Sequence, residues 1–292
     1  MDRAALSRVI FTADDFGLSE GVNEAVERAH CAGVLHAASL MVAGPAVADA
    51  VRRARSLPNL RVGLHLVVIQ GLAVLTPDEI PDLVDTDGWF PSGQLRLGIN
   101  YFGRPRARRQ LAAEIGAQFS AFAATGLTLH HADAHKHMHL HPTVGRLMLE
   151  IGREFGLSRV RVPAEPPAVL GRCGTRVGVG AHALYHWTHV LRRQVRAAGM
   201  TTTDHCFGIA WSGHMTRERV RRLMRELPDG ESEVYFHPAV ARDATLQRLM
   251  PDYEHEAELA ALLEAPSPGA ARRPLPQAGE VAVCRACPAV WG

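Results

Sequence analysis

The chain has almost no lysine, few cysteines and no long apolar run, and each shortage bears on the class of protein. Only one of its 32 basic residues is a lysine, Lys136, and all the others are arginines. We interpret this skew, together with the abundant alanine, as the composition of a GC-rich genome and not as a binding function. The formal net charge is only +2, so the overall charge does not indicate a nucleic-acid partner.

The five cysteines do not indicate a disulfide framework, because they are odd in number and mostly scattered. Cys284 and Cys287 form a CxxC without a second pair, so we expect neither a zinc nor a redox site there. A reducing compartment is favoured. No apolar run reaches the roughly 18 residues of a membrane span. The first strand begins almost at once, without a signal-peptide core, and we therefore expect a cytoplasmic protein.

Strand and helix patterns alternate along the 292 residues, which predicts an α/β fold with a parallel sheet. The predicted strands are 8–13, 38–42, 61–66, the histidine-rich segment 130–141, 159–162, 204–209 and 233–237. We predict one domain over residues 1–264, a distorted (β/α) barrel of about seven parallel strands. A poorly ordered tail is expected over 265–292.

One long stretch between predicted elements, residues 70–104, is irregular and rich in glycine, proline and aspartate. Loops of this length in a compact domain are usually functional lids or disordered inserts. The stretch carries Trp89, Phe90, Tyr101 and Phe102, which could stack on a sugar ring or hold a hydrophobic aglycone. A packed surface loop is the alternative.

Six of the 16 histidines lie within residues 130–141. Neutral imidazole is a common ligand of zinc-like cations, so this density predicts a metal site. In an extended segment His135, His137, His139 and His141 would share one side. In a helix His135 and His139 would share a face instead. Both conformations could present a pair of histidines to a metal.

Other ionisable residues follow apolar strands. The run Val9–Ala13 ends at Asp14 and Asp15, whose side chains should diverge, so that one can bind a metal while the other stays free as a base. A turn or a helix cap is the alternative reading. The residues at or near predicted strand ends are Asp14, Asp15, His65, His135 and His237. In a (β/α) barrel such ends share one rim, and an open doubly wound sheet also places ligands there. We favour the barrel because it brings distant strands together.

These motifs resemble the YdjC/ChbG-like carbohydrate deacetylases. The matching runs are Thr12-Ala-Asp-Asp-Phe-Gly17, Gly63-Leu-His-Leu66, His131-Ala-Asp-Ala-His-Lys-His-Met-His139 and Phe236-His-Pro238. The resemblance extends over residues 8 to about 262. Asp204-His-Cys-Phe-Gly208 and Trp211-Ser-Gly213 are similar to the branch associated with hopanoid biosynthesis (HpnK-like). The tail after about Ala265 does not resemble the family's usual ending.

The resemblance implies a metal-dependent carbohydrate N-deacetylase, a hydrolase of a C–N amide bond. Asp15, His65 and His135 would hold one divalent ion, zinc or magnesium, with His139 as a substitute for His135. Asp14 would be the general base toward a metal-activated water, and His237 the candidate general acid. The expected substrate is an N-acetylated sugar or glycolipid, such as an N-acetylglucosaminyl hopanoid.

Other functions stay open. The chain could be a metal-dependent hydrolase of another amide or an ester on the same barrel. It could also be a carbohydrate- or lipid-binding protein without turnover, although pure binding does not need a free carboxylate beside the metal. A homodimer and a peripheral membrane contact are compatible with the sequence.

Overall fold

The computed structural model describes residues 7–265, and within them six strands form one all-parallel sheet. The strand order is β4-β3-β2-β1-β6-β5. The strands are β1 (Ser7–Phe16), β2 (Ala37–Leu40), β3 (Arg61–Leu66), β4 (Ala132–Ala134), β5 (His205–Phe207) and β6 (Gly230–Phe236). This is the predicted α/β class with a parallel sheet, and it is consistent with a distorted barrel. The predicted tail from residue 266 onward, with its CxxC, lies outside the described residues.

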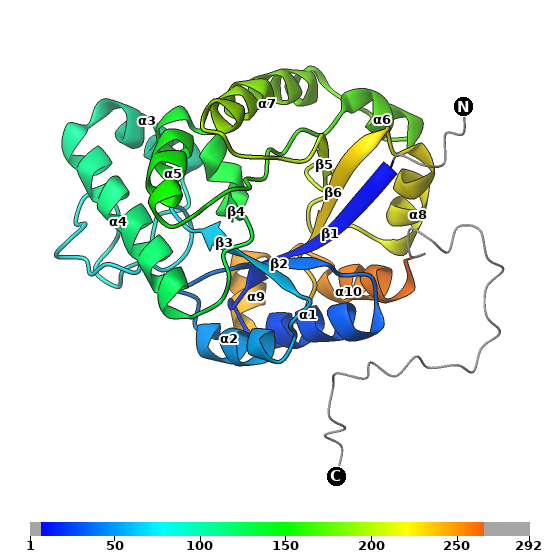
Figure 1. Cartoon of the computed structure of the whole chain (residues 1–292), viewed down its shortest axis with the longest axis horizontal. Helices are drawn as coiled ribbons and strands as arrows, with labels where there is room; N and C mark the ends of the chain where they lie inside the picture. Colours follow the sequence, from blue (N-terminus) through cyan, green and yellow to red (C-terminus); the bar gives the residue numbers. More distant parts are fainter. Residues whose placement is uncertain (1–6, 266–292) are drawn as a thin grey trace, which may run out of the picture.

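Helices surround the sheet (Figure 1). They are α1 (Glu20–Ala32), α2 (Val47–Arg55), α3 (Gln94–Gly103), α4 (Pro105–Ala124), α5 (Pro142–Glu154), α6 (Pro167–Arg172), α7 (Val179–Ala197), α8 (Arg217–Glu226), α9 (Ala244–Leu249) and α10 (His255–Glu264), with the 3₁₀ segment η2 (His135–Leu140). In the view of Figure 1, α1, α2 and α10 lie below the sheet, α3 to α5 on one side and α7 along the top. Helices on all sides explain why the strands are nearly continuous apolar runs.

The central strand β1 positions the first pair of carboxylates. It pairs with β6 from Ser7 to Ala13 and with β2 on its other edge. The pairing with β2 shifts register between Ala13 and Phe16. An irregularity of this kind re-aims the side chains within it. The strand therefore keeps both faces in the core while Asp14 and Asp15 point to different partners at its carboxyl end.

Helix α1 begins and ends where the sequence predicts. The Ser19 hydroxyl accepts a hydrogen bond from the amide of Val22 (3.3 Å), and the cap residue at the other end is Gly33. Helix α5 is followed by Gly156 in the left-handed region (φ +79°), also as predicted. These two helices follow β1 and η2, so their ends fix the course of the chain next to the site.

The predicted strand at 159–162 is reduced to isolated parallel bridges, Ala132 with Val160 and Arg159 with Thr201. Pro163, Pro166 and Pro167 follow at once, and proline restricts its predecessor and lacks an amide donor. A regular seventh strand is therefore absent from residues 7–265. The bridges still place this segment between β4 and the chain that enters β5, so that Arg161 faces the interior.

Two further expectations differ from the structure. The histidine segment is a strand only over Ala132–Ala134, because Lys136 (φ +51°) and His137 (φ +54°) then turn into the left-handed region. The histidines from His135 to His141 therefore share neither one side of a strand nor one face of a regular helix. The stretch 70–104 is irregular only up to Gly93 and then forms α3. Its Phe90 and Tyr101 are buried in the core, and neither lines the cavity described below.

Candidate metal centre and active site

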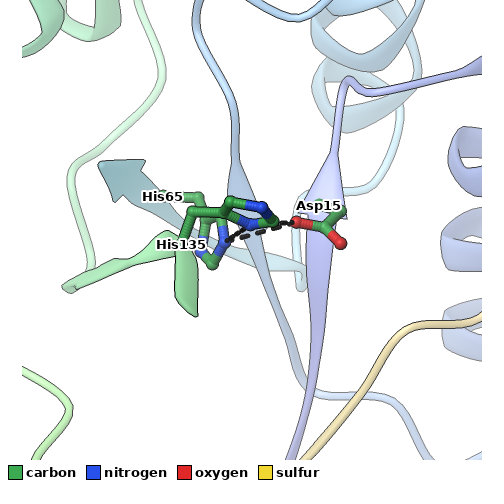
Figure 2. A group of neighbouring side chains, drawn as sticks. All are labelled: Asp15, His65 and His135. Carbon is green, nitrogen blue, oxygen red and sulfur yellow. Dashed lines mark hydrogen bonds and ion pairs between the residues drawn. The ribbon is translucent and has the colours of Figure 1, made fainter. Parts of the chain in front are cut away.

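Asp15 sits at the carboxyl end of β1 in an uncommon backbone conformation, with φ at +61°. A non-glycine residue adopts this conformation only where its surroundings hold it there. This conformation directs the buried Asp15 carboxylate toward two histidines from other elements, His65 of β3 and His135 after β4 (Figure 2). Three segments far apart in the sequence thus meet at one point.

The three facing atoms lie at nearly equal separations. Asp15 Oδ1 is 3.3 Å from His65 Nε2 and 3.1 Å from His135 Nδ1, and the two nitrogens are 3.4 Å apart. Ligands bound at about 2.0–2.1 Å around a tetrahedral ion lie roughly 3.3 Å from one another. The other oxygen, Asp15 Oδ2, is buried without a hydrogen-bond partner among residues 7–265. The residues present therefore fit one divalent cation.

Asp133 orients the His65 ring. Its Oδ1 accepts a hydrogen bond from His65 Nδ1 (2.7 Å), and its Oδ2 accepts one from the Ser39 hydroxyl (2.8 Å). Because a carboxylate only accepts, Nδ1 carries the proton and Nε2 is left as the ligand atom. Burial opposes ionisation of Asp133, but Arg161 and then His65 hold its pKa well below the ordinary value. Burial is the largest single influence on His65 and lowers its pKa, but Asp133, Asp15 and Asp14 together outweigh it and raise that pKa to about 10.

Asp14 forms a buried ion pair with Arg161, while its carboxylate stays close to His65 and Asp133. The guanidinium forms two bonds with it, Nη1 to Oδ2 at 2.7 Å and Nη2 to Oδ1 at 2.8 Å. Burial raises the pKa of Asp14 to about 6, against the opposing charge of Arg161. Asp14 thus has a fixed orientation, and it is not the unpartnered carboxylate that the sequence suggested.

Arg161 is the centre of a network that the sequence analysis missed. Besides Asp14 it contacts Asp133 (2.7 Å) and Glu233 (2.8 Å), and it lies 4.8 Å from the centre of the Tyr235 ring. Its side chain is fully buried. The available signal was an arginine inside an apolar strand-like run, Val160-Arg-Val162, because a charge is buried only when it is paired.

A second group of possible ligands, Asp14, His65 and Asp133, also converges. Its atoms are already engaged, since His65 Nδ1 donates to Asp133 while Arg161 bridges Asp14 and Asp133. Only the group of Asp15, His65 and His135 leaves an oxygen without a partner. We therefore treat that group as the candidate metal centre and the other as its supporting network.

The remaining histidines of the run serve other contacts. His137 bonds through Nε2 to the Tyr235 hydroxyl (2.9 Å), and His139 bonds through Nε2 to the main-chain carbonyl of Arg161 (2.9 Å). The ring of His141 packs against Tyr101. The structure thus brings His135 alone of this set to the candidate metal centre, and it does not bring His139 there.

His237 follows β6 and faces the same cavity. Burial lowers its pKa to about 4, although Asp15 opposes this effect, so the ring is neutral at neutral pH. Its Nδ1 has no hydrogen-bond partner among the described residues, and the nearest acidic atom is Glu258 Oε2 at 4.0 Å. Burial raises the pKa of Glu258 to about 7. A neutral imidazole with a free nitrogen can exchange a proton with a bound molecule.

The cavity in front of these groups has a volume of about 490 Å³. Besides Asp14, His65, His135 and His237, its walls include the polar side chains of Lys136, His137, Ser212, Tyr235 and Tyr253. An apolar pocket of about 360 Å³ shares the His135 wall and includes Trp89, and a groove of about 770 Å³ shares Lys136 and His137. A polar cavity with apolar neighbours suits a ligand that has both kinds of surface.

Comparisons with known proteins identify a matching family and similar sequences. A family model described as YdjC-like protein matches residues 8–268. A carbohydrate deacetylase of Brevibacillus brevis is 37% identical over 240 residues, which cover 82% of this chain and 84% of that protein. One of Geobacillus stearothermophilus is 31% identical over 232 residues, 79% of this chain and 78% of that protein.

Among solved structures, one from Enterococcus faecalis, described as a candidate cellobiose-phosphate cleavage protein, superposes with a TM-score of 0.69. It is 22% identical and covers 89% of this chain and 92% of that one, which supports the fold alone. Among the described residues, no helix is long and apolar enough to cross a membrane.

Proposed function

The chain belongs to the YdjC-like family, and from this premise we propose that it hydrolyses the acetamido group of an N-acetylated sugar with the help of a divalent cation. The observation that carries the proposal is the convergence of Asp15, His65 and His135 beside a cavity that His65, His135 and Asp14 line. The names of the two relatives, both carbohydrate deacetylases, support the substrate class.

We assign Asp15, His65 and His135 as the ligands of the cation. Bound there, it would supply a Lewis acid that polarises the amide carbonyl and lowers the pKa of a water molecule. A ligand set of two imidazole nitrogens and one carboxylate oxygen suits zinc. Magnesium is the alternative, because it also binds carboxylates. Asp133 keeps Nε2 of His65 available, so it acts as a positioning residue for the centre.

Asp14 is the proposed general base. It lines the cavity, and each carboxylate oxygen bonded to Arg161 retains a second lone pair for an incoming water. With a pKa raised to about 6 by burial, Asp14 is ionised at neutral pH and holds a proton more readily than an exposed aspartate. The Arg161 fork fixes the direction in which the carboxylate faces.

His237 is the proposed acid toward the departing amine. Because its ring is neutral at rest, it must first gain a second proton before it can act as an acid. We propose that the proton taken from water by Asp14 passes through His237 to the sugar nitrogen as the C–N bond breaks. The oxygen of that water ends in acetate, so a free amine and acetate are the two products.

The finer proposal is that the substrate is a glycolipid, an N-acetylglucosaminyl hopanoid. The resemblance of the run Asp204–Gly208 to the hopanoid-associated branch supports it. Support also comes from the groove of about 770 Å³ that shares Lys136 and His137 with the cavity, because its wall includes Leu140, Leu184 and Trp187. A hydrocarbon aglycone needs an apolar surface of this kind beside the sugar site.

The test is acetate release from a panel of N-acetylated sugars, a hopanoid glycolipid and acetate esters. Each is measured with the full chain, after EDTA treatment, and after addition of zinc or magnesium. We expect release from at least one N-acetylated sugar, loss with EDTA and recovery with one of the two metals. Release from the esters alone would favour another hydrolase. No release from any substrate with metal present would contradict the proposal.

A further inference from the structure

The groove beside the cavity is bordered by two helices that expose apolar side chains. Gln94 and Gly98 of α3 lie on one border, Leu184 and Trp187 of α7 lie on the other, and Leu140 of η2 lies between them. Seven large apolar side chains are exposed in the described part of the chain, and six of them belong to α3 and α7. The six are Leu95, Ile99, Phe102, Val179, Trp187 and Val190. We call them the apolar rim.

On α3 the exposed residues follow helical spacing. Leu95 is 79% exposed, Ile99 63% and Phe102 69%, at positions i, i+4 and i+7. Leu97 and Tyr101 occupy the opposite, buried side. Scattered apolar residues on a surface are ordinary, but three large ones on one face of a ten-residue helix indicate a surface that something covers.

The two helices that carry the apolar rim have only positive charges. Residues 88–113 and 166–203, which contain α3, the start of α4 and α7, include ten arginines and no aspartate or glutamate. Eight of these arginines form no ion pair within residues 7–265, where only Arg106 and Arg172 are paired. Of the acids close in sequence, Asp82 pairs with Arg106, and Glu150 of α5 pairs with Arg146.

Apolar side chains among unpaired arginines favour an anionic lipid surface as the partner. Such helices bury their apolar residues at the boundary of headgroup and acyl chain while their arginines contact the anionic headgroups. A second copy of the chain is a poor fit, because a two-fold contact would bring arginines against arginines. A nucleic acid would satisfy the arginines and leave Leu95, Ile99 and Phe102 without an apolar partner.

We propose that the face formed by α3 and α7 docks on anionic lipid bilayers. The groove at this face shares Lys136 and His137 with the catalytic cavity, so docking would place the cavity next to the lipid. The docking proposal rests on the surface alone and is independent of the chemistry proposed for the cavity.

The test is co-sedimentation of the full chain with vesicles of phosphatidylcholine and phosphatidylglycerol, and with vesicles of phosphatidylcholine alone. We expect binding to the anionic vesicles, weaker binding to the neutral ones, and loss of binding at high salt. The double variant Ile99→Ser/Phe102→Ser should bind about tenfold less tightly, since both side chains leave the lipid. The double variant Arg108→Gln/Arg109→Gln should also bind less tightly.

Matched controls lie elsewhere on the molecule. Among residues 7–265, Val74→Ser removes the one large exposed apolar side chain outside the rim, and Arg221→Gln/Arg225→Gln removes two exposed arginines of α8 that form no ion pair there. Both should bind vesicles like the unaltered chain. Circular dichroism should show every variant folded, and hydrolysis of a water-soluble N-acetyl sugar should be unchanged in the α3 variant, which separates docking from catalysis.

Three results would overturn the proposal. The first is no binding to anionic vesicles. The second is equal loss of binding in the α3 and α8 variants, because docking would then be non-specific charge attraction. The third is a dimer, measured by light scattering, that dissociates in Ile99→Ser/Phe102→Ser, because a second copy would then cover the rim.

Discussion

At the scale of single residues, two adjacent aspartates have different surroundings. Asp15 faces His65 and His135, whereas Asp14 faces Arg161. The sequence predicted that the two side chains diverge, because neighbours on a strand alternate. It could not predict which partner each would meet, since Arg161 lies far away in the sequence, in a segment that only the folded sheet brings close.

The first prediction concerns the histidine ligands. His65→Ala and His135→Ala should each lose most of the bound metal, because a three-ligand site is left with two. His139→Gln is the matched control, since His139 bonds to the carbonyl of Arg161 and not to the cluster. Elemental analysis of the purified variants measures this. Metal loss in His139→Gln together with retention in His135→Ala would reverse the assignment.

The second prediction concerns Arg161. Arg161→Met should lower the free energy of unfolding by about 3–5 kcal/mol, because it leaves the carboxylates of Asp14, Asp133 and Glu233 buried without their cation. The free energy of unfolding of Arg161→Lys should lie between those of Arg161→Met and the unaltered chain. Lysine keeps the positive charge but cannot form the two parallel hydrogen bonds of a guanidinium. Urea denaturation measures both.

The control for Arg161 is Arg146→Met. Arg146 pairs with Glu150 on the exposed side of α5, and both side chains are more than half exposed. Exposed pairs contribute little to stability, so this variant should unfold almost as the unaltered chain does. If Arg161→Met and Arg146→Met have the same free energy of unfolding, the buried network around Arg161 does not stabilise the fold.

At the scale of elements, the sequence predicted the carboxyl ends of β3 and β6 to within one residue and that of β1 to within three, and Asp15, His65 and His237 lie at or next to these ends. It did not predict the shape of the histidine segment. Two consecutive non-glycine residues in the left-handed region, Lys136 and His137, leave no signal in the sequence, because glycine usually occupies such positions. Only tertiary contacts, such as that of His137 with Tyr235, make this turn favourable.

Helix α3 was missed for a related reason. Gly93, Gly98 and Gly103 lie at its start, middle and end, and glycine disfavours helix. Burial of Leu97 and Tyr101 stabilises the helix despite this composition. The carboxyl ends of strands were therefore predictable, whereas elements held by distant packing were not.

The third prediction tests the packing of β3 against β4. A Cβ at position 63 would lie 2.5 Å from ring atoms of His131. His131 Nε2 is 3.1 Å from the Ser39 hydroxyl, which in turn bonds to Asp133. Gly63→Ala should therefore destabilise the protein by about 1–3 kcal/mol and weaken metal binding through Asp133.

Gly116→Ala is the matched control. Gly116 lies within α4, and no atom is within 4 Å of an added Cβ. The change should stabilise the protein by about 0.5–1 kcal/mol, because alanine favours helix over glycine. Thermal unfolding and metal content are measured for both variants. A stabilised Gly63→Ala would show that the ring of His131 moves freely.

At the scale of the whole molecule, the candidate metal centre ties together β1, β3 and the segment after β4. A cation that binds only the folded chain stabilises it by mass action. Because Asp133, Asp15 and Asp14 together raise the pKa of His65 to about 10, both ring nitrogens of His65 carry a proton below that pH in the metal-free protein. Only its neutral form binds metal, so binding releases a proton and tightens as pH rises.

The fourth prediction follows from this linkage. Apparent metal affinity should rise by up to about tenfold per pH unit between about pH 6 and 9, and the melting temperature with metal should rise relative to that in EDTA. Calorimetry in buffers of different ionisation enthalpy measures the proton release. Metal affinity that is constant across this range would show that His65 is already neutral.

Metal content and acetate release, measured together in Asp14→Asn and Asp15→Asn, test whether Asp15 holds the cation while Asp14 works as the base. Asp14→Asn keeps the size of the side chain and loses the basic oxygen. It should keep its metal and its KM while kcat falls by on the order of 10²–10⁴-fold. Asp15→Asn should lose metal and activity together. Full turnover in Asp14→Asn, or loss of its metal while Asp15→Asn keeps its own, would contradict the account.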